Sequence, residues 1–127
     1  MSKYKSQGFK GTYRNALKGL RLALKSEKNI RIHFAVALLV VFGGICFKFS
    51  AVEFSILLIA IALVIIAEMV NSAIEFSLDA IFHNKYSKLV GMAKDIAAGA
   101  VMLATYVSVA IGILLFGSKI ISVMLCT

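Results

Sequence analysis

Four polar side chains recur at helical spacing towards the end of an apolar stretch. They are Glu68, Asn71, Glu75 and Asp79. Spacings of three, four and four residues place them on one helix face about 80° wide. A carboxylate within a membrane span costs about 2.5–3.5 kcal/mol, so Glu68 and Glu75 indicate a function. Asn71 and Asp79 also have structural explanations, as a helix-packing contact and an ordinary interfacial residue.

A lysine and an aspartate precede the last apolar stretch. Lys94 and Asp95 are followed directly by Ile96–Ala100, whose small residues allow another helix to approach closely. Asp95 could simply complement the helix dipole, whereas Lys94 is a compact cation that can reach phosphate oxygens. Carboxylates with a lysine suggest Mg²⁺, which binds one or two carboxylates together with substrate phosphates. The residues alone therefore predict an acidic site at the inner membrane surface that handles a metal–phosphate ligand.

The composition requires these residues to lie in a small membrane protein. The 127-residue chain has 61% hydrophobic and 16% charged residues, against about 45–50% and 25% in soluble domains. This composition excludes a soluble globular enzyme, a disordered tail and a disulfide scaffold. Apolar stretches predict spans at about residues 30–48, 52–79 and 95–117. The predicted fold is all-α and integral to the membrane, with residues 1–127 forming one domain.

The net charge of +8 lies before the first span. Residues 1–31 carry nine basic residues and one acid, and the rest of the chain carries five of each. This placement favours anionic lipid headgroups as partners over nucleic acid. By the positive-inside rule it also predicts a cytoplasmic N-terminus and an outside C-terminus in a multi-pass membrane protein.

Residues 9–28 are predicted to form an amphipathic helix in the membrane surface. At 100° per residue their basic side chains share one stripe, opposite a face of aromatic, leucine and alanine side chains. The basic stripe comprises Arg14, Lys18, Arg21, Lys25 and Lys28. If this helix continues without a break, Glu27 projects from its apolar side, where an acid needs a partner.

Several segments resemble the signature of the small bacterial integral-membrane lipid kinases, the prokaryotic diacylglycerol kinase and undecaprenol kinase family. The resemblance spans about residues 9–116. The matching segments are Glu68–Glu75 with Asp79, Ala93–Val101, Gly19–Arg21, and Ser26–Asn29 with Arg31 and His33.

The resemblance implies an ATP- and Mg²⁺-dependent lipid kinase of the bacterial cytoplasmic (inner) membrane. In this family a surface helix and three transmembrane helices assemble as a homotrimer, with active sites shared between neighbouring subunits. Glu68 would then be the general base acting on the lipid hydroxyl. Glu27 and Glu75 would hold the cation bound to ATP, and Lys94 and Asp95 would contact the nucleotide. Supporting or substrate-contacting roles fall to Arg21, Asn71 and Asp79.

The expected substrate is undecaprenol, giving undecaprenyl phosphate, because Glu27–His33 looks more like the undecaprenol-preferring branch of the family. Diacylglycerol, giving phosphatidic acid, is the alternative. The chain departs from the family pattern at Asn84–Tyr86, so nucleotide contacts in residues 80–93 stay open. Two other classes compete: a small proton- or cation-translocating subunit, and a structural or pore-forming peptide. The sequence shows no inverted repeat or proline-broken helix typical of transporters, and the acidic stripe opposes a purely structural role.

Overall fold

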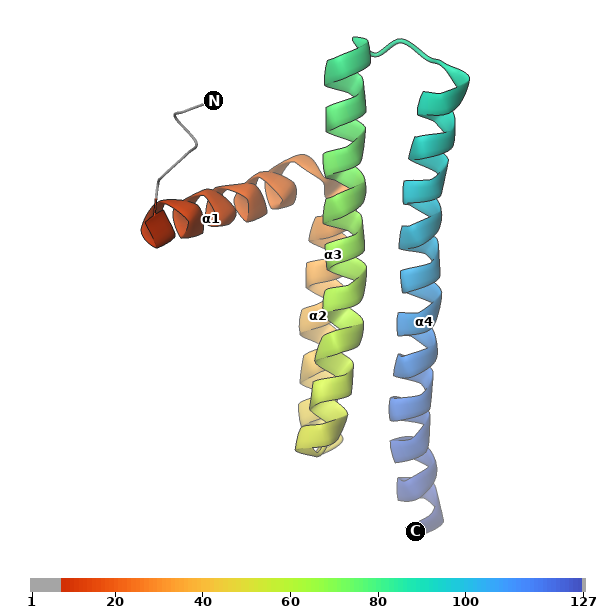
Figure 1. Cartoon of the computed structure of the whole chain (residues 1–127). Coiled ribbons are helices and arrows are strands. Elements are labelled where there is room, and N and C mark those ends of the chain that lie inside the picture. The colour runs from red at the N-terminus through yellow and green to blue at the C-terminus, as the bar shows by residue number, and fades with distance from the viewer. Residues whose placement is uncertain (1–7, 127) are drawn as a thin grey trace.

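The computed structural model describes residues 8–126, which form four α-helices (Figure 1). They are α1 (Gly8–Ser26), α2 (Lys28–Cys46), α3 (Ala51–Phe82) and α4 (Lys88–Cys126). No strand occurs within this described part of the chain. The prediction of an all-α fold is confirmed.

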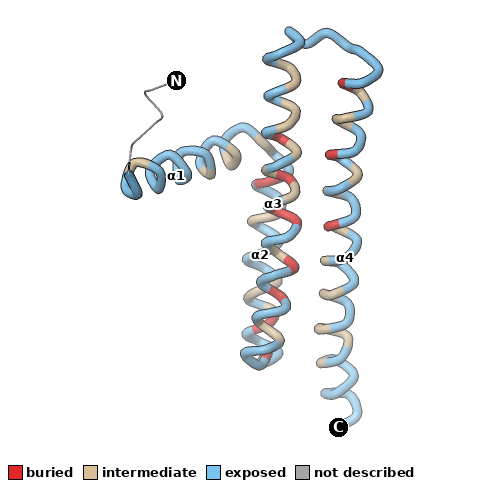
Figure 2. The backbone as a smooth tube through the Cα atoms, in the orientation of Figure 1, coloured by how far each residue is buried: buried red, intermediate tan, exposed pale blue. Residues whose placement is uncertain are grey.

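The helices α2, α3 and α4 are each long and apolar enough to cross a membrane. Helix α3 contacts both α2 and α4, and successive helices run in opposite directions (Figure 1). Helix α1 projects sideways from the bundle. The buried residues of α4 lie on its side towards α3, while the outer surfaces are exposed (Figure 2). Many of these exposed side chains are large and apolar, as expected of helices that face lipid.

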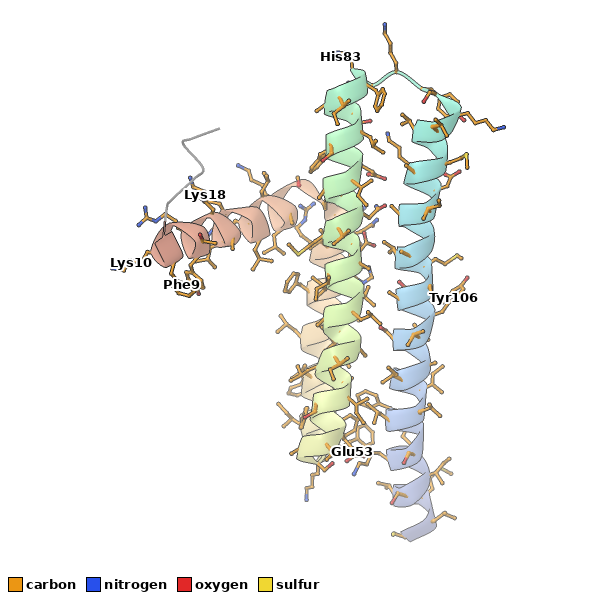
Figure 3. All side chains as sticks on the ribbon, viewed as in Figure 1. Phe9, Lys10, Lys18, Glu53, His83 and Tyr106 are labelled. Carbon is orange, nitrogen blue, oxygen red and sulfur yellow. The ribbon has the colours of Figure 1, made fainter. Side chains whose placement is uncertain are left out.

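The turn between α2 and α3 is held by a reciprocal cap. The Ser50 hydroxyl accepts from the Glu53 backbone N–H at 3.2 Å, and Glu53 Oε1 accepts from the Ser50 backbone N–H at 2.8 Å. This is a capping box, which satisfies two backbone donors at the start of α3. The Glu53 carboxylate, at the end of α3 near α4 in Figure 3, also lies 3.0 Å from Nζ of Lys119 on α4. All three long helices are therefore tied together at this end.

An aromatic cluster reinforces the same end of the bundle. The ring of Phe116 on α4 lies 5.8 Å from that of Phe47 and 4.9 Å from that of Phe49, measured between centroids. The Phe49 ring also lies 5.6 Å from that of Phe54. Gly44 allows this packing, since a Cβ there would come within 2.9 Å of Phe54 Cε1. The rings therefore pack α4 against the turn between α2 and α3.

Helices α3 and α4 extend beyond the spans predicted at 52–79 and 95–117, and only residues 83–87 connect them. The turn uses left-handed backbone conformations at His83 (φ 52°) and Asn84 (φ 62°). The Ser87 hydroxyl accepts from the Val90 N–H at 3.2 Å, at the start of α4. Hydropathy marks the edge of an apolar segment, whereas helical hydrogen bonding continues through charged residues. The 39 residues of α4 extend about 58 Å, well beyond a 30 Å hydrocarbon core.

The chain bends sharply between α1 and α2. Helix α1 ends at Ser26, and Glu27 is extended (φ −116°, ψ 112°) as the residue before α2. The Arg31 guanidinium donates from Nη1 to the carbonyl oxygens of Leu24 and Lys25 at 2.8 and 2.9 Å. These bonds satisfy carbonyl groups left free at the end of α1. Helix α1 therefore stops before residue 28, and Glu27 lies at a corner, not on the apolar side of a continuing helix.

Candidate functional site

Glu68 is buried in α3 and has a polar partner on α2. Its Oε1 lies 3.3 Å from Nε2 of His33. Only 9% of Glu68 is exposed to solvent, while His33 is half-buried. A neutral imidazole with its proton on Nε2 can donate towards such an oxygen. The predicted general base is thus held between two helices.

The polar face of α3 continues next to Glu68. Ser72 is buried, with 6% of its surface exposed. Asn71 Oδ1 is also buried, and it has no hydrogen-bond partner among the described residues. Buried acceptors in folded proteins nearly always have a donor. A water molecule, a ligand or another subunit would have to supply the donor for Asn71.

Glu27 and Glu75 lie at a similar level of the bundle. Because α2 and α3 run antiparallel, the contact between His33 and Glu68 sets their register. Glu27 is six residues before His33, and Glu75 is seven residues after Glu68, so both are about 9–10 Å further towards the α3–α4 connection. Both carboxylates are half-buried. This level is therefore closer to the end of the bundle than the buried Glu68.

The six acidic residues divide into two groups of three. Within residues 8–126, Glu68 pairs with His33, Asp79 with Lys94, and Glu53 with Lys119. The other three have no ion pair in this described part of the chain: Glu27, Glu75 and Asp95. These unpaired acids are three of the four residues that the sequence predicts to bind ATP or its metal ion.

Lys94 brings α4 against the end of the acidic stripe. Its Nζ lies 2.7 Å from Asp79 Oδ1, and the two side chains are 35% and 38% exposed. One of the three ammonium donors is used in this contact, which leaves donors for a ligand. Asp95 is exposed beside Lys94. The structure therefore brings together the predicted residues Asp79, Lys94 and Asp95.

A polar hollow of about 320 Å³ lies between these residues and the α3–α4 connection. It is lined by Asp79, Asn84, Lys85, Tyr86, Val90, Gly91, Lys94 and Asp95. The Tyr86 ring lies so close to Gly91 that a Cβ there would be 2.8 Å from Cε2 of the ring. The segment that departs from the family pattern, residues 84–86, thus forms one wall of the hollow.

Arg21 stands apart from the other candidates. It is exposed on α1, a helix without buried residues that projects away from the bundle (Figure 1). Within residues 8–126, no hydrogen bond or ion pair joins Arg21 to the acidic face. A supporting or substrate-contacting role for Arg21 therefore stays a prediction.

An apolar groove of about 350 Å³ runs along α3 between α2 and α4. His33 lines it, together with Val40 of α2, Leu57 of α3 and Gly112 of α4. Ser108 in the groove donates to the Ala60 carbonyl at 2.8 Å, so its hydroxyl is satisfied within the bundle. His33, which contacts Glu68, thus also borders the apolar groove.

The carboxylates fit a metal that arrives with a phosphate ligand better than a preformed metal centre. Among residues 8–126, no group of three or more His, Cys, Asp or Glu side chains is placed to hold a metal ion. Mg²⁺ needs only one or two carboxylates when phosphates and water supply the other ligands. Glu27 and Glu75, both free of ion pairs in this part of the chain, match that requirement.

His33 is the site residue that the sequence prediction missed. The prediction included it in a motif but gave it no chemical role. The signal is the hairpin register: His33 lies 13 residues before the end of α2, and Glu68 lies 17 residues after the start of α3. In an antiparallel pair with a short turn, such residues are within about one helical turn of the same level.

The amino-acid sequence of the chain matches a known protein family. Residues 14–116 match the family described as prokaryotic diacylglycerol kinase. A diacylglycerol kinase of Synechocystis sp. is 32% identical over 113 residues, which are 89% of this chain and 65% of the relative; the chain thus spans about two thirds of it. An undecaprenol kinase of Bacillus subtilis is 34% identical over 106 residues, covering 84% of this chain and 85% of the relative. A diacylglycerol kinase of Escherichia coli K12 is 37% identical over 92 residues, covering 72% and 75%.

The matched region includes every candidate residue from Arg21 to Asp95 and reaches from α1 into α4. Three apolar helices agree with a membrane kinase, and the names of the relatives imply a lipid substrate. A kinase of this kind also requires a metal ion in general. The chain therefore belongs to the prokaryotic diacylglycerol kinase family, whose members are membrane lipid kinases.

Proposed function

We propose that the chain transfers the γ-phosphoryl group of ATP to the hydroxyl of undecaprenol and so forms undecaprenyl phosphate. The observation that carries this proposal is the buried carboxylate of Glu68 beside a groove lined by apolar residues. The undecaprenol kinase of B. subtilis supports the substrate, because the match covers 84% of this chain and 85% of that relative. Diacylglycerol is the second candidate, supported by the names of the Synechocystis and E. coli relatives.

Glu68 is the proposed general base. Its carboxylate accepts the proton of the lipid hydroxyl while the hydroxyl oxygen forms a bond to the γ-phosphorus. The bond from that phosphorus to the β–γ bridging oxygen breaks, and ADP leaves. The burial of Glu68 suits this role, since a lipid alcohol reaches the site through the bilayer and not from water. Such transfer depends mainly on positioning and charge stabilisation.

The proposed nucleotide site lies nearer the α3–α4 connection. Glu27 and Glu75 are the residues that would hold Mg²⁺, which when bound neutralises charge on the phosphate oxygens. Lys94 and Asp95 contact the nucleotide at the polar hollow, and Asp79 orients Lys94 through their 2.7 Å contact. Asn71 and Arg21 complete the proposed set as supporting or substrate-contacting residues.

The proposed assembly is a homotrimer with sites shared between neighbouring subunits. A single chain, within residues 8–126, does not gather three metal-ligating side chains in one place. Helix α1 projects away from its own bundle (Figure 1), which leaves it free to reach a neighbouring subunit. In this arrangement Glu27 of one subunit would meet the acids on α3 of another.

The proposed orientation places α1 on the cytoplasmic surface of the bacterial inner membrane. Lys18 and Phe9 are nine residues apart, a rotation of about 180°, and they project from opposite sides of α1 (Figure 3). A helix with opposed basic and apolar sides suits an interface with anionic lipid. ATP would then reach the hollow at the α3–α4 connection from the cytoplasm.

The decisive experiment measures transfer of label from γ-labelled ATP into lipid. Purified protein is supplied in mixed micelles with undecaprenol, diacylglycerol or ceramide, and Glu68→Gln is the matched control. We expect labelled undecaprenyl phosphate with the unaltered protein and about 10²–10⁴-fold less with Glu68→Gln. If phosphatidic acid is the only labelled lipid, the substrate is diacylglycerol and not undecaprenol. Absence of labelled lipid in every arm would contradict the kinase proposal and favour a translocating subunit.

The two glutamates of α3 should respond differently to substitution. Glu68→Gln should lower kcat while ATP binding persists, because it removes the base and preserves the side-chain shape. Glu75→Gln should weaken binding of ATP in the presence of Mg²⁺ and raise the Mg²⁺ concentration needed, because it removes a metal ligand. Titrations of Mg²⁺ and ATP separate these effects after the oligomer has been verified. Unchanged kcat for Glu68→Gln would refute the base assignment.

A further inference from the structure

We propose that His33 is a positioning residue that holds Glu68 in the orientation needed to accept the lipid proton. The inference rests on the proposed function of Glu68 and adds a residue to it. Among residues 8–126, the contact between His33 Nε2 and Glu68 Oε1, at 3.3 Å, is the one contact of the Glu68 carboxylate with a basic side chain. It joins α2 to α3 within the apolar part of the bundle.

The chemistry of the pair favours a positioning role. A glutamate side chain has three rotatable torsions, so a free carboxylate would sample several orientations. The contact from Nε2 is to Oε1 alone, so it leaves the other carboxylate oxygen for the substrate. A base that is itself oriented by a third group is a recurrent arrangement in enzymes that activate a hydroxyl nucleophile. His33 thus restricts Glu68 without touching the reacting atoms.

The place of His33 in the bundle supports the same conclusion. The imidazole lines the apolar groove and is half-buried, while the Glu68 side chain is only 11% exposed. A buried carboxylate without a donor would carry the cost of desolvation alone. His33 brings a ring nitrogen to 3.3 Å from Oε1 from a separate helix, so movement of α2 relative to α3 would change the orientation of the base.

The test compares His33→Leu with His33→Gln. Leucine removes the donor and suits a membrane helix, whereas the glutamine amide places an N–H near the position of Nε2. We expect kcat to fall about 10- to 100-fold in His33→Leu, with the KM for ATP changed by less than about twofold. Glutamine should restore kcat to within about threefold of the unaltered protein. Leu39→Val, an exposed position of α2, is the control for general helix perturbation.

A double-substitution cycle isolates the action through Glu68. In the Glu68→Gln background, adding His33→Leu should change the residual kcat by less than about twofold, because the base is already absent. If His33→Leu fails to assemble, His33→Asn replaces it, since its shorter side chain withdraws the donor from Glu68.

Distinct results would overturn the positioning role and the proposed function. A normal kcat in His33→Leu, with Glu68→Gln inactive, would refute the role of His33 and leave the kinase proposal intact. An equal loss in His33→Gln and His33→Leu would also refute it, because an amide donor would then be insufficient. A protein that labels no lipid at all would refute the kinase proposal itself.

Discussion

The ion pair between Asp79 and Lys94 permits a quantitative test of the proposed nucleotide site. We consider Asp79→Asn, which keeps the acceptor oxygen and removes its charge, and Lys94→Met, which keeps the length of the side chain and removes the ammonium group. If Asp79 acts only by orienting Lys94, the first substitution should be mild and the second severe. The double variant should then behave like Lys94→Met alone.

The structure sets the expected magnitudes. The two atoms are 2.7 Å apart, but the side chains are 35% and 38% exposed, so solvent screens the pair. Such partly exposed pairs contribute about 0.2–1 kcal/mol, which limits the effect of Asp79→Asn on ATP affinity to about fivefold. A charged contact from Lys94 to a phosphate is worth about 1.5–3 kcal/mol, so Lys94→Met should weaken ATP binding about 10- to 150-fold.

The assay is direct binding of a non-hydrolysable ATP analogue in mixed micelles, followed by kinetic titration of ATP at saturating lipid. The Mg²⁺ dependence should not shift in Lys94→Met, because the lysine contacts phosphate and not the metal. A loss in Asp79→Asn as large as that in Lys94→Met would refute the orienting role. If the double variant binds ATP more weakly than Lys94→Met does, by the full effect of Asp79→Asn, then Asp79 acts independently of Lys94.

Three further predictions concern packing, orientation and assembly. Gly44→Ala would place a methyl group 2.9 Å from a phenylalanine ring atom, so it should lower the free energy of unfolding by about 1–3 kcal/mol. A thermal or denaturant titration measures this change, and unchanged stability would contradict the packing. In a cysteine-free background, an impermeant thiol reagent applied to cells should label Ala51→Cys but not Lys85→Cys; the reverse pattern would invert the orientation. Mixed oligomers of Glu27→Gln and Glu68→Gln should regain part of the activity, and no recovery in verified mixtures would contradict shared sites.

The sequence predicted the features that depend on local patterns. Three apolar segments and the spacing of Glu68, Asn71, Glu75 and Asp79 required only hydropathy and helical periodicity, and the structure contains the corresponding helices. Recognition of the family rested on motifs of similar length, and residues 14–116 confirm it. Each of these signals is contained in one continuous segment of the chain, so no knowledge of tertiary packing was needed.

Features that depend on contacts between helices could not be predicted in the same way. The partner of Glu68 is 35 residues away in sequence, and its identification requires the register of α2 against α3. The corner at Glu27 depends on Arg31, which bonds carbonyl groups of the preceding helix across the bend. Helices α3 and α4 extend beyond the apolar segments because charge ends a hydrophobic segment without ending a helix.

The restraints at the Ser50 turn have a mechanical consequence for the opposite end of the bundle. The capping box, the Lys119 contact and the aromatic cluster fix the helices at that turn, so α3 and α4 can tilt relative to each other only about this point. Asp79 is 26 residues beyond Glu53 on the same helix, a distance of about 39 Å. A tilt of about 3° between α3 and α4 about the turn would move Asp79 by about 2 Å relative to Lys94, enough to separate the pair. Stiffness at one surface of the membrane therefore governs the alignment of charged groups at the other.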